Sequence, residues 1–355
     1  MMTAPAALLT VDLDALAANF HTLRALASGA EVAPVIKADG YGVGAGPAAR
    51  RLKAEGAVRF FTARLTGGLV GREALGPGPT VYVLDGCRQG DVDALIQSDL
   101  TPVLSSLEQV ERWRAEGRGR SCVLHVDTGM SRLGLRPEQA QTLDPAGLNV
   151  ELVMSHLACA DEPDHPANAR QLDAFRALRQ IFPDARRSLA NSAGILLGQP
   201  YAFDAVRPGI ALYGAGPCGH PEPRLKPVAT FSAEVLQVRH VKAGETVGYG
   251  ATFTAERDLT AAVLAVGYAD GFSRAHGNGR GAVWLNGVLC PVLGRVSMDL
   301  TVVDASDCDV KPGDMGEVFG PNRRVEDAAQ AAGTLAYELL TSVSPRVRRR
   351  WIGEV

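Results

Sequence analysis

The chain has 355 residues, of which 46% are hydrophobic and 21% charged, so it is long enough for two domains with ordinary cores. Its 36 Lys and Arg against 39 Asp and Glu give a net charge of −3, which provides no overall field for nucleic acid or a membrane surface. The six cysteines form no Cys-X-X-Cys pair, so we expect no metal site and a reducing, cytoplasmic setting. We also find no signal peptide and no stretch approaching the ~20 apolar residues of a membrane span.

Short apolar runs alternate with helical patterns along the first two thirds of the chain. The predicted strands are residues 8–11, 32–36, 59–63, 80–84, 101–104, 121–126, 149–155, 187–189 and 204–206. The predicted helices are residues 12–27, 47–55, 90–97, 106–116, one beginning at 138–141, 166–181 and 192–197. About eight strand–helix units predict an α/β fold of the (β/α)8 TIM-barrel type, with a doubly wound open sheet as the alternative.

The pattern changes after about residue 217, where Pro221, Pro223 and Pro227 mark a linker. The predicted strands beyond it are residues 229–240, 260–266, 282–285, 288–292, 301–304 and 317–319, with one helix at 325–331. Asn286-Gly287 predicts a hairpin. We therefore expect a barrel over residues 8–220 and a mostly-β domain over 221–355, with residues 1–7 as a candidate extra strand of the latter. The basic cluster formed by Arg346 and Arg348 to Arg350 fits a solvated or dimer-facing end.

A lysine directly follows a buried-looking strand in the segment Val35-Ile36-Lys37-Ala38-Asp39-Gly40. This places Lys37 at the C-terminal end of a barrel strand, where such folds carry catalytic groups. A partly desolvated lysine there has a lowered pKa and can form a Schiff base with an aldehyde. Taken alone, however, a lysine at the end of a strand is more often a solvated charge.

Motifs along nearly the whole chain favour the Schiff-base interpretation of Lys37 over a solvated charge. They are Thr10-Val11-Asp12-Leu13, residues 35–44, His125-Val126-Asp127-Thr128-Gly129-Met130-Ser131-Arg132-Leu133-Gly134, Ser155-His156-Leu157-Ala158, Asn191-Ser192-Ala193-Gly194, residues 206–214, Val247-Gly248-Tyr249-Gly250, Gly267-Tyr268-Ala269-Asp270-Gly271, residues 294–299 and Ala336-Tyr337-Glu338. In this order and spacing they resemble the alanine racemase family. The resemblance implies an isomerase that uses pyridoxal 5'-phosphate (PLP), interconverts L-alanine and D-alanine, supplies D-alanine for cell-wall peptidoglycan, and is a homodimer with shared active sites.

The resemblance also implies a two-base mechanism, with one base on each face of the PLP aldimine to remove and return the Cα proton. Lys37, which carries the cofactor, is one base, and Tyr249 of the second subunit is the other. Because an unperturbed tyrosine has a pKa of ~10, it needs nearby positive charge or hydrogen bonds, and His156 beside Arg207 is the implied relay. By its local sequence alone, Tyr249 is explained equally well as a packing residue in a Gly-Tyr-Gly turn.

Arg207 is implied to face the pyridine nitrogen of PLP. Since arginine keeps its proton in practice, the ring nitrogen stays largely unprotonated, which disfavours a long-lived carbanion and side reactions such as transamination. A structural ion-pair role before the Pro-Gly turn is the alternative for Arg207. The other implied contacts are Tyr41, Ser192, Gly209, Ile210 and Tyr337 for the phosphate, Arg132 and Met298 for the substrate carboxylate, and Tyr268 with Tyr337 at the entrance. Ser192 also fits a helix N-cap.

One position departs from the family pattern. Many members carry a carbamylated lysine two residues before the Asp of Asp-Thr-Gly-Met, whereas this chain has His125 there. Because histidine forms no stable carbamate, we hypothesise that Arg132 is oriented by an anion such as chloride or by His125 itself. Ser297 and Leu300 also differ in type from the common forms.

Three other functions stay open. A decarboxylase of the same fold, acting on basic amino acids, is opposed by an arginine at the ring nitrogen. A non-catalytic PLP carrier built from the barrel alone is opposed by the β domain with Tyr249. A broad-spectrum racemase is usually exported, and we find no signal peptide.

Overall fold

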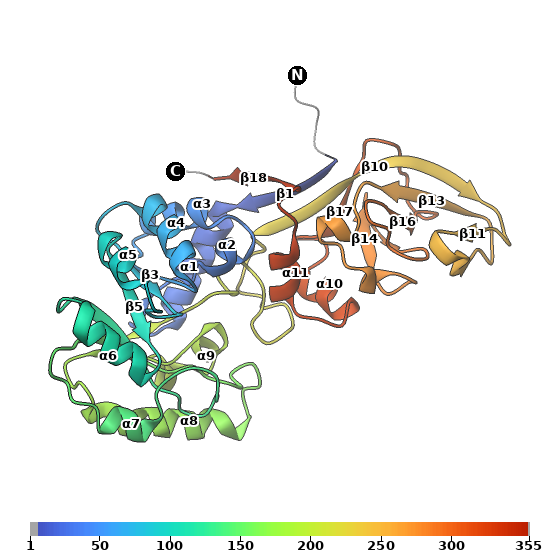
Figure 1. Cartoon of the computed structure of the whole chain (residues 1–355). Helices are drawn as coiled ribbons and strands as arrows, with labels where there is room; N and C mark the ends of the chain where they lie inside the picture. Colours follow the sequence, from blue (N-terminus) through green and yellow to red (C-terminus); the bar gives the residue numbers. More distant parts are fainter. Residues whose placement is uncertain (1–5, 354–355) are drawn as a thin grey trace. The chain divides into compact units, whose positions relative to one another are not determined.

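The computed structural model describes residues 6–353, which divide into two compact units (Figure 1). One unit runs from Leu16 to Leu212, and the other combines residues 6–15 with residues 213–353. The division therefore falls before the expected boundary at residue 220, and the strand at residues 8–11 belongs with the C-terminal unit. Of the candidate N-terminal strand over 1–7, residues 1–5 lie outside the described residues.

The first unit holds a closed ring of parallel strands. Six strands form one sheet in chain order: β3 (Arg59–Thr62), β4 (Thr80–Val83), β5 (Leu100–Leu104), β6 (Ser121–His125), β7 (Asn149–Met154) and β8 (Arg186–Ser188). Strand β2 (Glu31–Val32) pairs with β9 (Ala205–Val206). The bridges Val35–Phe61 and Asn191–Arg207 join that pair to the two edges of the sheet. The eight strands thus close, which confirms the TIM-type barrel over the open sheet.

Helices follow the barrel strands, except that the first helix follows the strand at residues 7–12. They are α1 (Leu13–Leu26), α2 (Lys37–Tyr41), α3 (Ala45–Ala54), α4 (Leu65–Leu75), α5 (Val92–Gln97), α6 (Leu107–Glu116), α7 (Pro137–Gln141), α8 (Pro166–Ala177) and α9 (Ser192–Leu196), with short 3-10 turns at Leu178–Gln180 and Gln199–Tyr201. None of the helices within residues 6–353 is long and apolar enough to cross a membrane.

Helix α4 was not predicted, because Gly67, Gly68 and Gly71 are poor helix formers. The structure explains their presence. A Cβ on Gly68 would lie 2.9 Å from Leu100 Cδ1, and one on Gly67 would lie 2.5 Å from Thr62 Oγ1. The glycines therefore let α4 pack directly on the strands, and tertiary packing outweighs the low helix propensity.

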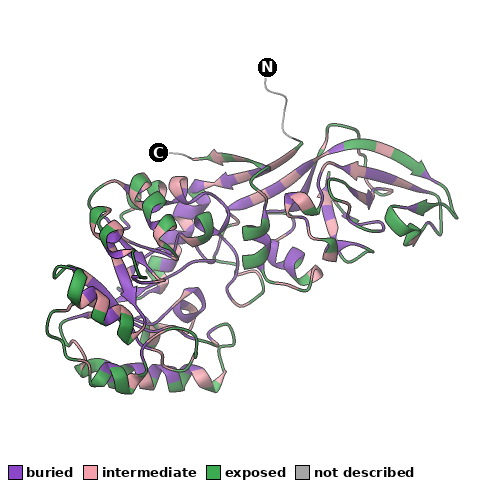
Figure 2. Cartoon of the chain, viewed as in Figure 1, coloured by how far each residue is buried: buried purple, intermediate pink, exposed green. Residues whose placement is uncertain are grey.

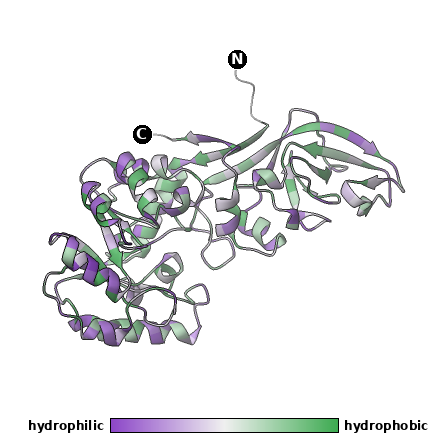
Figure 3. Cartoon of the chain, viewed as in Figure 1, coloured by the Kyte–Doolittle hydropathy of each residue, from purple (hydrophilic) through white to green (hydrophobic). Residues whose placement is uncertain are grey.

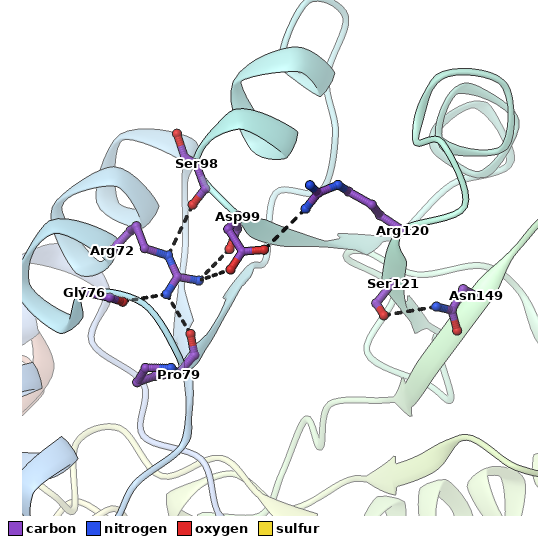
Figure 4. A network of polar contacts seen from close by, with 8 residues as sticks. All are labelled: Arg72, Gly76, Pro79, Ser98, Asp99, Arg120, Ser121 and Asn149. Atoms are coloured by element: carbon purple, nitrogen blue, oxygen red, sulfur yellow. Dashed lines mark hydrogen bonds and ion pairs between the residues drawn. The ribbon is translucent and has the colours of Figure 1, made fainter.

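The N-terminal ends of the middle strands are tied together by arginines (Figure 4). Arg72 of α4 donates hydrogen bonds of 2.6–3.2 Å to four backbone carbonyls, those of Gly76, Pro79, Ser98 and Asp99. Its guanidinium also pairs with the Asp99 carboxylate, which Arg120 reaches from the other side. These contacts hold the loops that enter β4 and β5, at the end of the barrel opposite to Lys37.

The second unit is built on the long strand β10 (Ala229–Val241). Strand β1 (Ala7–Asp12) lies between β10, to which it is antiparallel, and β18 (Arg348–Ile352), to which it is parallel. The other elements are β11 (Thr246–Val247), β12 (Phe253–Thr254), β13 (Leu259–Leu264), β14 (Ala282–Leu285), β15 (Val288–Pro291), β16 (Thr301–Asp304), β17 (Met315–Phe319), α10 (Val325–Ala331) and α11 (Ala336–Ser342). The mostly-β character is therefore confirmed.

Local chemistry accounts for two features of this unit. The hairpin predicted at Asn286-Gly287 joins β14 and β15, and both residues have positive φ (43° and 94°), as a tight type I′ turn requires. In β10, buried and partly buried residues alternate from Ala229 to Val235, whereas most of the distal part is exposed (Figure 2) and mixes hydrophobic with hydrophilic residues (Figure 3). The first half of the strand thus contributes to one core, and Val241 at its end joins a second hydrophobic cluster with Val247, Leu259 and Leu293.

Candidate active site

The segment after Lys37 has an unusual backbone. Residues 38–41 all have φ between 52° and 61°, a short left-handed turn, although only Gly40 is a glycine. For other residues this conformation costs roughly 1–2 kcal/mol each, so tertiary contacts must stabilise it. The Asp39 carboxylate accepts a hydrogen bond from the Ala45 amide (2.8 Å) at the start of α3. The turn leads the chain from the strand end into α3 and directs the Tyr41 side chain into the barrel unit, where it is buried.

Tyr41 lies against a small backbone cradle. A Cβ on Gly209 would lie 2.0 Å from Tyr41 Oη, so only glycine fits there. Ser192 Oγ accepts hydrogen bonds from the Gly209 and Ala211 amides (2.9 and 3.3 Å). The Ile210 amide donates to no group within residues 6–353, although the residue is 1% exposed. The structure thus brings together the four barrel residues expected at the phosphate.

Ser192 does not cap helix α9. That role belongs to Asn191, whose side-chain oxygen accepts from the Gly194 amide (2.8 Å). The Ser192 hydroxyl is therefore committed to the 209–211 backbone, and the N-cap alternative for this residue is wrong.

Arg207 is fully enclosed, with 4% of its surface exposed. Its guanidinium donates to Ser188 Oγ and to the Ser155 carbonyl, both at 2.5 Å, and to the Leu189 carbonyl at 3.3 Å. All these acceptors are neutral, so the structural ion-pair alternative for Arg207 is not observed. Burial lowers the pKa of Arg207 to about 9, which still leaves it charged near neutrality.

Lys37 is half-buried, and its Nζ lies 6.0 Å from the centre of the Tyr41 ring. Burial is the main cause that lowers the pKa of Lys37, and the charges of Arg132 and Arg207 lower it further. Among residues 6–353, none of these three cations forms an ion pair. The carboxyl ends of the strands therefore hold an uncompensated positive charge.

Two histidines lie within the field of this cluster. Burial, and then the charge of Arg207, lower the pKa of His125 to about 4. The pKa of His156 is also held well below its usual value, by burial and then by Arg207 and Arg132. No side-chain hydrogen bond joins His156 to Arg207 in the described chain. Both imidazoles are therefore neutral at physiological pH.

A buried amide that the sequence did not single out connects these groups. Gln171 of α8 donates to Thr128 Oγ1 (3.3 Å) and to the His156 carbonyl (3.0 Å). Thr128 hydrogen-bonds Ser155 Oγ at 2.7 Å, and the Ser155 carbonyl accepts from Arg207. Gln171 lies in an ordinary amphipathic helix, so no local signal marks it.

The other predicted site residues belong to the C-terminal unit. Tyr249 stands in a tight turn between Gly248 and Gly250, both with positive φ, and its surface is 72% exposed. Met298 and Tyr268 are also exposed, and they lie on adjoining loops: the Tyr268 amide donates to the Ser297 carbonyl and the next amide donates to the Met298 carbonyl, both at 3.0 Å. Tyr337 lies on α11 with 38% of its surface exposed.

Arg346 fastens those two loops together. It donates to Asp270 (2.7 Å) in one loop and to Asp299 (2.8 Å) in the other. The basic cluster near the C-terminus is therefore not merely solvated, since at least this arginine has a structural partner on each loop. Nothing in the local sequence distinguishes Arg346 from its neighbours.

A closed α/β barrel with a cationic cluster at the carboxyl ends of its strands, joined in one chain to a mostly-β unit, defines a two-domain barrel enzyme. Residues 11–217 match the model of the alanine racemase N-terminal domain, and residues 228–351 match that of the C-terminal domain. The chain belongs to the alanine racemase family.

Individual relatives agree with this assignment. A catabolic alanine racemase of Mesorhizobium japonicum is 44% identical over 363 residues, covering 99% of this chain and 94% of the relative. An alanine racemase of a Jannaschia species is 46% identical, covering 96% of this chain and 97% of the relative. The crystal structure of Bartonella henselae alanine racemase with covalently bound pyridoxal phosphate superposes with a TM-score of 0.93 at 36% identity, covering 99% and 100% of the two chains.

Proposed function

We propose that this chain is an alanine racemase that uses PLP and interconverts L-alanine and D-alanine. The observation that carries the proposal is the uncompensated cluster of Lys37, Arg132 and Arg207, which adjoins the Gly209 cradle in a chain of the alanine racemase family. Of these three cations Arg207 is buried, Lys37 is half-buried and Arg132 is exposed. A buried cation without a carboxylate partner favours an anionic ligand beside it. A phosphorylated aldehyde fits this site, because its phosphate supplies the anion and its aldehyde can react with the Lys37 amine.

The residues present fit PLP. The unpartnered Ile210 amide and the close approach at Gly209 leave a cradle suited to a phosphate, with Tyr41 and Ser192 beside it. We assign Tyr337 to the phosphate as well. When bound, PLP supplies the electron-withdrawing ring that acidifies the substrate Cα–H.

Lys37 is the attachment residue and the base on one face. Because its pKa is lowered, more of the amine is neutral near pH 7 and can accept a proton from Cα. Arg207 acts only as a donor toward the ring nitrogen, since three neutral acceptors already hold its guanidinium in place. We assign His156, which lies near the charge of Arg207, the role of a relay that supports proton transfer on the opposite face.

Tyr249 is the second base, supplied by the other subunit of a homodimer. Its high exposure in the isolated chain supports this assignment, because a residue that serves another subunit's site has no packing role within its own chain. Its turn rests against Arg295, whose guanidinium lies close to Gly250. The shared site would account for the exposed aromatic residues of the C-terminal unit.

Arg132 binds the substrate carboxylate, with the backbone of Met298 as a second donor, and Tyr268 with Tyr337 limits the side chain to about a methyl group. His125, being neutral, cannot orient Arg132 by opposite charge. Two possibilities follow: an anion such as chloride beside Arg132, or an imidazole nitrogen that accepts a hydrogen bond from it. Crystals soaked in bromide test this, since an anomalous peak supports the anion, and neither a peak nor a His125 contact overturns both.

We assign the activity to the cytoplasm and to the supply of D-alanine for peptidoglycan. The relative named as catabolic makes alanine breakdown the second candidate role. Deletion of the gene separates the two: a requirement for external D-alanine supports cell-wall supply, whereas failure to grow on alanine as carbon source supports breakdown.

Incubation of the purified protein with L-alanine in D2O tests the reaction itself. Exchange at Cα with loss of optical rotation supports the racemase. Release of CO2 would instead identify a decarboxylase, and bound cofactor without turnover of any amino acid would identify a carrier.

A further inference from the structure

Two cysteines of the C-terminal unit lie against one hairpin and have no part in the proposed reaction. Leu285 and Val288 are the paired residues that close the β14–β15 hairpin. The Cys290 thiol donates to the Val288 carbonyl (3.8 Å), and the Cys308 thiol donates to the Leu285 carbonyl (3.2 Å). Because the two acceptors face each other across the hairpin, the thiols converge on the same spot.

The loop that carries Cys308 is fixed on this turn. The Asn286 side-chain amide donates to the Asp309 carbonyl (2.8 Å) and to the Asp314 carboxylate (2.9 Å). The Cys308 amide donates to the Ala305 carbonyl (3.1 Å). The neighbourhood of the thiols is thus set by contacts on both sides of Cys308.

The two thiols differ in access and interact with each other. Cys290 is fully buried, whereas Cys308 is half-buried and reachable from solvent. Burial raises the pKa of Cys290 to about 12, and contact with Cys308 contributes. Burial also raises the pKa of Cys308, while the contact with Cys290 opposes this. The carboxylates near the two thiols are Asp304, Asp307, Asp309 and Asp314.

We propose that Cys290 and Cys308 are a modification site at which a low-molecular-weight disulfide such as oxidised glutathione forms an intrachain disulfide. The Cys308 thiolate attacks the reagent, which forms a mixed disulfide and releases one thiolate. The Cys290 thiolate then attacks Cys308 Sγ and displaces the second reagent thiolate. The two protons lost by the cysteines pass to the two released thiolates, so the protein is oxidised by two electrons and the reagent is reduced.

The bond closes a loop that contains Met298. That loop supplies the carbonyls which hold Tyr268 and the following residue. A cross-link at its base restricts the unfolded chain, so the oxidised protein should have a higher midpoint of thermal unfolding. The formation of the bond does not depend on the proposed function.

The test treats the full-length, PLP-loaded protein with oxidised glutathione, blocks free thiols, and maps the cysteines by mass spectrometry. We expect a peptide linked through Cys290 and Cys308 that a dithiol reductant separates. Because the thiolate is the attacking species and the thiol pKa values are raised, the rate should rise about tenfold per pH unit through the neutral range. A rate independent of pH would contradict the assigned order of attack.

The other cysteines provide controls. Cys159 and Cys218 are half-buried, so they show that the reagent is active, whereas Cys87 and Cys122 are fully buried and should stay free. The Cys290→Ser variant should retain glutathione at Cys308, because no second thiol displaces it.

The Cys308→Ser variant should leave Cys290 unmodified. Two outcomes overturn the proposal: free thiols at Cys290 and Cys308 in a wild-type protein whose Cys159 is modified, or a glutathione adduct that persists at wild-type Cys308.

Discussion

The two ends of the barrel differ in whether their charged side chains are paired with opposite charges. At the N-terminal end, the Glu31 carboxylate accepts from Arg59 (2.6 Å) and Arg186 (2.7 Å), and Tyr82 donates to Glu151 (2.6 Å). At the same end, the Arg72 guanidinium donates hydrogen bonds to loop carbonyls. At the C-terminal end, Lys37, Arg132 and Arg207 have no ion-pair partner within the described chain. Paired charges indicate stability, and unpaired charges indicate a ligand, so substitutions at the two ends should separate these effects.

The largest expected effect is at Lys37. Lys37→Ala should remove the visible absorbance of the bound cofactor and lower kcat by at least 10²–10⁴-fold, since both attachment and one base are lost. Absorbance spectra and racemisation rates check this. The exposed Lys242→Ala variant is the matched control and should change neither. Retained absorbance in Lys37→Ala would remove Lys37 from its role.

Mixing two inactive variants tests the second base. The proposed homodimers of the Lys37→Ala and Tyr249→Phe variants should both be inactive. A mixed dimer regains one site with both bases if Tyr249 acts on the partner subunit. Racemisation by isolated mixed dimers is the measurement, and the absence of recovery in them would count against Tyr249 acting in trans.

The Arg207→Gln variant tests whether Arg207 keeps the pyridine nitrogen of PLP unprotonated. We expect racemisation to fall by about 10²-fold, because a buried preorganised donor is lost, and transamination to increase relative to racemisation. Product analysis by chiral chromatography and pyruvate assay measures both. If the ratio of transamination to racemisation stays unchanged, Arg207 does not control which of the two reactions occurs.

His125 should make folding stability depend on pH. Its pKa is about 4 in the folded protein and 6.5 as a free side chain, so the unfolded chain binds more protons between these values. Stability therefore falls as the pH drops from 6.5 to 4, by about 3 kcal/mol from this group. The His125→Asn variant should lose that part of the slope in urea unfolding measured across this range. An identical slope would contradict the buried neutral imidazole.

Arg72→Met tests the opposite end of the barrel. Loss of its carbonyl contacts should destabilise the fold by about 1.5–3 kcal/mol, with kcat unchanged for the folded protein. Arg118 is the matched control, because its ion pair with Asp93 is exposed on both sides, and Arg118→Met should cost less than about 1 kcal/mol. A large loss of kcat in folded Arg72→Met would break the contrast between the two ends.

Three features of the fold could be predicted from the sequence, because they depend on local patterns of apolar and turn residues. They are the alternation of strands and helices, the hairpin at Asn286-Gly287, and the change to a strand-rich pattern after residue 217. Lys37, Arg207 and Tyr249 became candidate site residues through the order and spacing of motifs along the chain, because local patterns alone did not favour that role. Helix α4 was missed, because close packing against Leu100 and Thr62 favours glycines that disfavour an isolated helix.

Only the tertiary structure placed strand β1 in the C-terminal sheet, because pairing with β10 and β18 joins residues far apart in the sequence. The same holds for Gln171 and Arg346, whose partners lie on other segments. Charge compensation also depends on neighbours in space, so the composition could not show that Arg207 is buried among neutral acceptors. The sequence by itself determined which residues are the candidates for the chemistry, and the fold decided which of their charges go unpaired.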